Sequence, residues 1–109
     1  MKRQTPKNSG TEVNVMSALR KSAKGQDCQV RMPGICNFDK STTVLAHLGG
    51  GGMGMKHPDL FGAYCCSSCH EEADRVTRRI DAVTAKLWLL EGIIRTQEIM
   101  LKNGLIEIK

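Results

Sequence analysis

The chain has 109 residues, of which 40% are hydrophobic and only 4% aromatic, and it carries a formal net charge of +5. This length is enough for one domain with one modest core and excludes two. The excess of basic over acidic residues favours a polyanionic partner. We rank nucleic acid ahead of a membrane surface, because no apolar run approaches the roughly 18 residues needed to span a bilayer.

The N-terminal segment is basic and polar. We expect residues 1–14 to form a flexible arm and residues 15–109 to form a single domain. The segment lacks the apolar run of a secretory signal, so we expect a cytoplasmic protein. Thiols stay reduced in that compartment, where clustered cysteines bind a metal more often than they bind each other.

The first elements are a helix and a turn. The segment "VMSALRKSAKG" predicts a short helix that ends near Gly25. Pro33-Gly34 then marks a tight turn, which lets Cys28 and Cys36 lie across a loop and face one site.

Two strands follow, separated by a glycine-rich segment. "TTVLAHL" has the β-branched and apolar residues of a strand, ending near His47. "GGGGMGMKHPD" cannot be regular structure, because its glycines leave the backbone too free. "LFGAYC" is the second strand. The sequence therefore predicts a β-hairpin with a long, irregular loop.

From Cys69 onward the hydrophobic pattern has a helical period, and acidic residues occupy the first turn, where they suit the helix dipole. We expect this helical region to bend or break at Gly92, and a further helix to close at Asn103-Gly104. The expected apolar stripe comprises Val76, Ile80, Val83, Leu87 and Leu90.

The stretch "AYCCSSCH" is the most chemically specific part of the chain. Its "CSSCH" matches the pattern of covalent haem attachment, but that attachment normally takes place outside the cytoplasm and leaves Cys28 and Cys36 unexplained. A thioredoxin-like redox pair needs a βαβ setting with more strand than this chain offers. We therefore expect neither haem nor a redox centre.

A structural zinc explains more of the cysteines. Tetrahedral zinc sites gather four thiolates at about 2.3 Å from two chain segments. Cys28 and Cys36 can supply one pair, and Cys66 and Cys69 the other, at a helix start. Adjacent strand residues point to opposite faces, so we expect Cys65 to face away from the metal as a small buried residue.

All three histidines lie within 24 residues. His47 ends the first strand, His57 lies in the loop and His70 lies on the following helix. Such a ββα unit can hold a divalent cation and a general base beside a phosphodiester. Histidine suits the base because its pKa lies near neutrality, and the cation would stabilise the developing charge.

Basic residues follow on the predicted long helix, mainly on one side, since steps of three, four and seven share a face. Such a face is either solvated or in contact with DNA phosphates, in sequence-independent and salt-sensitive binding. The residues concerned are Arg75, Arg78, Arg79 and Lys86.

A strand-end "AH", a glycine-containing loop and a closing "C-x-x-C-H" resemble the HNH, or His-Me finger, nucleases of the zinc-stapled type. The segments "KGQDCQVRMPGICN", "TTVLAHL", "PDL", "CSSCHEEADR" and "LEGIIRTQEIMLKNGLI" more closely resemble the YbcO family of small phage and prophage proteins, described as nucleases, over residues 18–107. The resemblance implies an α+β fold with a ββα-metal, treble-clef-like core, a structural zinc and C-terminal helices.

The resemblance also implies roles for particular residues. His47 would be the general base, and His70 would bind a catalytic Mg²⁺ or Mn²⁺. The chain departs from the HNH pattern at two places: Ala46 stands where an Asp or His commonly binds the metal, and Phe61 lies near the place of the missing Asn. Asp59 could replace a ligand or orient His47.

We therefore expect a metal-dependent DNA endonuclease of phage or prophage origin in the bacterial host cytoplasm, as a monomer or small homo-oligomer that contacts mainly the DNA backbone. The main alternative is a non-catalytic, zinc-stapled DNA-binding module, which Ala46 and the missing Asn favour. A third is a phage adaptor that binds a protein partner through its apolar C-terminal helices.

Overall fold

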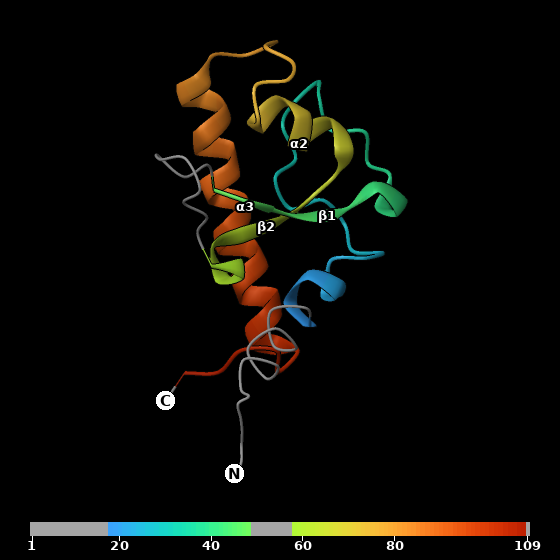
Figure 1. The fold of residues 1–109 in the computed structure, drawn as a ribbon, viewed down its shortest axis with the longest axis vertical. Helices are drawn as coiled ribbons and strands as arrows, with labels where there is room; N and C mark the ends of the chain where they lie inside the picture. The colour runs from blue at the N-terminus through green and yellow to red at the C-terminus, as the bar shows by residue number, and fades with distance from the viewer. Residues whose placement is uncertain (1–17, 49–57, 109) are drawn as a thin grey trace, which may run out of the picture.

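A two-stranded antiparallel sheet lies at the centre of the molecule (Figure 1). Strand β1 (Val44–His47) pairs with β2 (Gly62–Cys65), and His47 lies opposite Gly62. Short 3-10 turns, η1 (Lys40–Thr42) and η2 (Asp59–Phe61), precede the two strands. The predicted hairpin is confirmed. This computed structural model describes residues 18–48 and 58–108, so the expected N-terminal arm, most of the glycine-rich loop and His57 lie outside the described residues.

Helix α3 (Ala82–Lys102) crosses the two strands and packs mainly on β2 (Figure 1). The buried hydroxyl of Thr96 accepts a hydrogen bond from the Tyr64 backbone N–H at 2.9 Å, which fixes the helix against the strand. Helix α3 ends at Lys102 with Asn103 as its C-cap, and Gly104 has a φ of +74°, in agreement with the predicted close at Asn103-Gly104.

Of the predicted bend or break at Gly92, the break is wrong, because α3 is continuous through this position. Gly92 serves a different purpose there. A Cβ at Gly92 would lie 2.7 Å from Cγ2 of Val30 and 3.0 Å from its Cα. The glycine therefore lets the helix approach the coil that carries Cys28, and packing outweighs its low helix propensity.

The predicted long helix beginning at Cys69 is interrupted. Helix α2 (Ser67–Ala73) ends with Asp74 as its C-cap, and Arg75 has a φ of +64°. A loop of residues 74–81 then leads to α3. The buried carboxylate of Glu72 fastens this loop, since it accepts hydrogen bonds from the Ile80 N–H at 2.9 Å and the Thr77 hydroxyl at 2.7 Å.

The loop changes the phase of the helical pattern, so the expected apolar stripe is not the buried one. Val76, Val83, Leu87 and Leu90 are exposed. The side of α3 that faces the sheet and the cysteines has a different set of residues. It comprises Ala85, Leu89, Gly92, Ile93, Thr96 and Met100.

The buried side chains form two clusters. One surrounds the cysteines, and the other joins Leu19 and Ala23 of the first helical segment to Leu45, Tyr64 and Met100. That segment is helical over 18–22 and ends in a turn where Gly25 has a φ of +79°, in agreement with the predicted short helix. No helix in the described ranges is long and apolar enough to cross a membrane.

Candidate metal centre and catalytic pair

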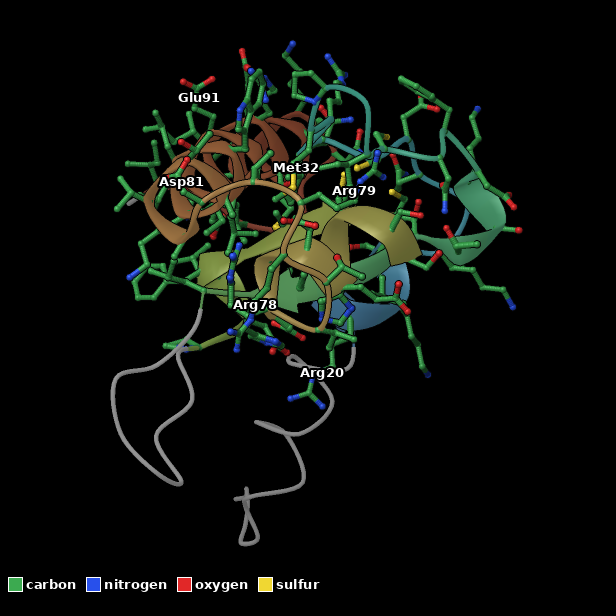
Figure 2. The ribbon with its side chains drawn as sticks, turned by 90° about the horizontal axis from the view of Figure 1, so that it is seen from above. Arg20, Met32, Arg78, Arg79, Asp81 and Glu91 are labelled. Carbon is green, nitrogen blue, oxygen red and sulfur yellow. The ribbon has the colours of Figure 1, made fainter. Side chains whose placement is uncertain are left out.

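Four cysteines converge on one point. The Sγ atoms of Cys28, Cys36, Cys66 and Cys69 all lie within 4.8 Å of one another, and those of Cys36 and Cys66 are 3.8 Å apart. In a tetrahedral site with Zn–S bonds of about 2.3 Å, neighbouring sulfurs are about 3.8 Å apart. The donor set therefore fits zinc. Figure 2 shows the sulfur atoms gathered between α2 and the coil that precedes β1.

The first pair of thiols is shaped by two tight backbone turns. Arg31 has a φ of +55° and donates its N–H to Sγ of Cys28 at 3.4 Å. Gly34 has a φ of +72° in the predicted Pro-Gly turn, and the Cys36 N–H closes that turn on the Met32 carbonyl at 2.9 Å. The sequence between the two cysteines thus curls them toward the same side.

The second pair lies at the start of α2. Cys66 is the N-cap of the helix, and its Sγ accepts a hydrogen bond from the Cys69 N–H at 3.4 Å. Sγ of Cys69 accepts one from the Met32 N–H at the same distance. Backbone donors of this kind stabilise a thiolate, which is the form that binds a metal.

The thiols ionise unequally. Hydrogen bonds with the Cys65 and Cys69 thiols lower the pKa of Cys28 below its usual range. Burial raises the pKa of Cys36 to about 11. A metal must therefore displace protons from part of this set, so its affinity will rise with pH.

Cys65 is fully buried and lies outside the set of four, as predicted. It does not face away from the other thiols, however. The neighbouring Cys28 and Cys69 thiols, together with burial, raise the pKa of Cys65. Strand alternation keeps it from being a fifth ligand, but the coil carrying Cys28 folds back against it.

A histidine and a buried carboxylate meet where the hairpin loop closes. Nε2 of His47 lies 2.5 Å from Oδ1 of Asp59. The Asp59 side chain is 1% exposed and that of His47 is 27% exposed. Nε of Arg20 lies 3.1 Å from Oδ2 and 3.2 Å from Oδ1 of Asp59. The pairing of β1 with β2 produces this contact, since η2 brings Asp59 back beside the end of β1.

This geometry assigns the protons of His47. An ionised carboxylate only accepts hydrogen bonds, so Nε2 is the donor. In a neutral imidazole with Nε2 as the donor, the other ring nitrogen, Nδ1, carries the lone pair. Arg20 supplies the positive charge that offsets Asp59 in a buried position. Nothing in the sequence signals Arg20, which lies 39 residues from its partner.

His70 forms a separate pair. Its Nε2 lies 3.1 Å from Oδ2 of Asp74, one turn further along the chain, and both side chains are partly exposed. The structure thus joins His47 to Asp59 and His70 to Asp74. Within residues 18–48 and 58–108, the four cysteines are the only group of three or more potential ligands that lie close together.

The predicted basic residues do not share one helix face. Arg75, Arg78 and Arg79 lie in the 74–81 loop, and only Lys86 lies on α3. Arg75 is engaged within the protein, where Nη2 donates to the Ile80 carbonyl at 2.9 Å. The other three are exposed and available to a ligand.

The family described as "Putative nuclease YbcO" matches residues 17–105. The chain belongs to the YbcO family. Relatives named "Putative nuclease YbcO" of Escherichia coli (strain K12) and "Putative nuclease ybcO" of Enterobacteria phage 82 are each 52% identical over 95 residues, covering 84% of this chain and 99% of their own length. A solved structure of a "putative bacteriophage protein" from Escherichia coli str. K-12 substr. MG1655 is 49% identical, with a TM-score of 0.71, and covers 80% of this chain and 100% of its own.

Membership of the YbcO family confirms the resemblance inferred from the sequence, and the phage relative agrees with a phage or prophage origin. The fold and the four-cysteine set agree with the expected α+β class and with a metal site in this family member.

Proposed function

We propose that this YbcO protein is a metal-dependent HNH-type endonuclease that hydrolyses phosphodiester bonds of DNA. The observation that carries the proposal is the pair of His47 and Asp59, a partly exposed imidazole held by a buried carboxylate at 2.5 Å. The names of its relatives and the net charge of +5 support a nucleic-acid substrate.

In the proposed mechanism His47 is the general base. Nδ1 takes a proton from the water that attacks phosphorus, and the imidazole becomes a cation. Asp59 fixes the ring and the tautomer beforehand and stabilises that cation afterwards. Arg20 limits this stabilisation, because its guanidinium competes for the same carboxylate.

The two metal roles are assigned to different residues. Cys28, Cys36, Cys66 and Cys69 would hold a structural zinc that ties the first coil to α2. His70 and Asp74 would hold the catalytic Mg²⁺ or Mn²⁺. They offer one imidazole and one carboxylate, which fits a cation that keeps most of its water. When bound, this cation neutralises charge on the reacting phosphate.

The exposed basic side chains would hold the DNA backbone. Arg78, Arg79 and Lys86 are free to contact phosphates. Such contacts carry no sequence information and position the duplex only. Arg75 would act indirectly, by holding the 74–81 loop through its bonds to Glu72 and Ile80.

Plasmid nicking with Mg²⁺ or Mn²⁺ tests the assignment. We expect His47→Ala to lower the rate by at least about 100-fold, the size of a typical general-base contribution. Asp59→Asn should lower it less, since the ring keeps a neutral partner. The matched control is Asp27→Asn, which removes a carboxylate that pairs with Lys40 at the surface and should leave the rate unchanged. Zinc content, measured for every variant, shows which of them are folded.

Equal nicking by His47→Ala and the unchanged protein would exclude His47 as the base. The alternative is a zinc-stapled DNA-binding module without catalysis. Ala46 favours it, because this residue is buried and offers no ligand beside His47. Retained DNA binding without nicking under either metal would select that alternative.

A further inference from the structure

A surface pocket of about 480 Å³ is lined in part by Arg20, the ion-pair partner of Asp59, and is not explained by the mechanism. The first helical segment supplies one wall, and the approach to β1 supplies the other. The lining residues are Arg20, Lys21, Lys24, Ser41, Thr43, Val44 and Leu45. We call it the Arg20 pocket.

The Arg20 pocket is strongly basic. Three of its lining side chains are cations, and none is an anion. Lys21 and Lys24 have no carboxylate partner in any ion pair of the described residues. Arg20 uses Nε for Asp59, which leaves the outer nitrogens of its guanidinium available. Figure 2 shows Arg20 extending beyond the edge of the ribbon.

A buried hydroxyl in the same wall lacks a partner. Thr43 is only 5% exposed, and its Oγ1 makes no hydrogen bond with any described residue. A buried polar group is almost always satisfied by protein, water or a ligand. By contrast, the Ser41 hydroxyl already donates to Asp39 at 2.7 Å. The Thr43 hydroxyl is therefore a neutral group in this wall without a hydrogen-bond partner among the described residues.

We propose that the Arg20 pocket binds a backbone phosphate of the DNA strand that His47 acts on. The proposal rests on the proposed nuclease function and adds where the substrate strand runs. Two ammonium groups, a guanidinium and a hydroxyl can donate hydrogen bonds to the oxygens of a phosphate. No carboxylate lines the pocket, so no lining side chain would repel the phosphate charge.

The position of the pocket agrees with this assignment. Val44 lines it at the start of β1, and His47 ends the same strand. Three strand steps span about 10 Å. Measured along the axis of a duplex, which rises about 3.4 Å per base pair, that length corresponds to roughly three base pairs. Arg20 lines the pocket and pairs with Asp59, the partner of His47, so the bound strand would pass from the pocket to His47 along β1.

Fluorescence anisotropy with a labelled 20-base-pair duplex tests the proposal in a His47→Ala background, with zinc bound and no added Mg²⁺. We expect Lys21→Gln and Lys24→Gln each to weaken binding and to reduce the slope of log K against log salt by about 0.9. Over a fourfold change in salt, that slope corresponds to about a threefold change in affinity. The matched control is Lys102→Gln, which removes an exposed lysine that pairs with Glu98 near the C-terminal end of α3 and does not line the pocket, and it should change neither quantity.

Thr43→Val separates hydrogen bonding from charge. We expect weaker binding with an unchanged salt slope, because the lost hydroxyl is neutral. The proposal is overturned if both lysine variants match Lys102→Gln, or if the duplex does not bind. If the unmutated protein nicks DNA but the lysine variants bind the duplex as well as it does, the phosphate site in the Arg20 pocket is refuted and the proposed nuclease function is not. If the lysine variants bind more weakly but the unmutated protein does not nick DNA, the proposed nuclease function is refuted and the phosphate site in the Arg20 pocket is not.

Discussion

Gly92→Ala places a methyl group where α3 meets the coil that carries the first metal-binding pair. In an exposed helix the change would stabilise the protein by about 1 kcal/mol, since alanine favours a helix more than glycine. Here the new Cβ would lie 2.7 Å from Cγ2 of Val30, 3.0 Å from its Cα and 3.1 Å from its N.

Two of these three atoms belong to the backbone, so rotating the Val30 side chain cannot relieve the contact. Overpacking in a core costs about 1–3 kcal/mol, and here it must also outweigh the gain in helix propensity. We expect a net destabilisation of about 1 kcal/mol, which lowers the Tm of a domain of this size by roughly 4–8 °C. Because Val30 lies two residues from Cys28, metal affinity should fall as well.

Thermal unfolding followed by circular dichroism measures the first effect, and competition with a chromophoric chelator measures the second. Val30→Ala in the Gly92→Ala background removes the closest atom, so the two changes should together cost less than their sum. A Gly92→Ala protein as stable as the unchanged one, with the same metal affinity, would show that the packing argument is wrong.

Three further predictions concern the metal, the helix and the loop. Cys36→Ser should lose the bound metal and unfold on mild heating, whereas Cys65→Ser should keep one equivalent by elemental analysis; equal metal content in both would contradict the ligand set. Leu89→Ala should cost about 2–5 kcal/mol in urea unfolding because this side chain is 4% exposed, and Leu87→Ala, 55% exposed, should change stability by less than about 0.5 kcal/mol. Glu72→Gln should destabilise the protein at pH 7. Burial opposes ionisation of Glu72, but its hydrogen bonds and a nearby arginine lower its pKa overall. The stability that the charged carboxylate contributes is therefore present above the unfolded pKa of about 4.3, and it is lost as the pH falls through the lower folded pKa. The difference between the two proteins should therefore shrink between pH 7 and pH 3, and a constant difference would exclude this role of the charge.

Features encoded by a few adjacent residues could be predicted from the sequence. The Pro-Gly turn curls Cys28 toward Cys36, and Cys66 caps α2 through its own C-x-x-C spacing. The hairpin followed from two β-rich runs around a glycine segment, and it carried Asp59 to His47. In each case the local chain geometry leaves little freedom.

Features that depend on distant partners could not be predicted. The helical period continued smoothly across residues 74–81, but the bonds that Glu72 makes with Ile80 turn the chain there instead. The purpose of Gly92 appears only when Val30 is placed against it. Arg20 joins the candidate site from a separate segment, so no motif around His47 could have indicated it.

The candidate base lies at the end of β1 and its carboxylate in η2, on either side of residues 49–57. The Leu48 N–H joins the two sides by donating to the Phe61 carbonyl at 3.2 Å. Lengthening a tethered loop costs little, about 0.6 kcal/mol for each doubling. This hairpin could therefore accept inserted or exchanged sequence between residues 48 and 58 and still present His47 to water. New binding specificity could be grafted at this point of the chain without a change in the reaction centre.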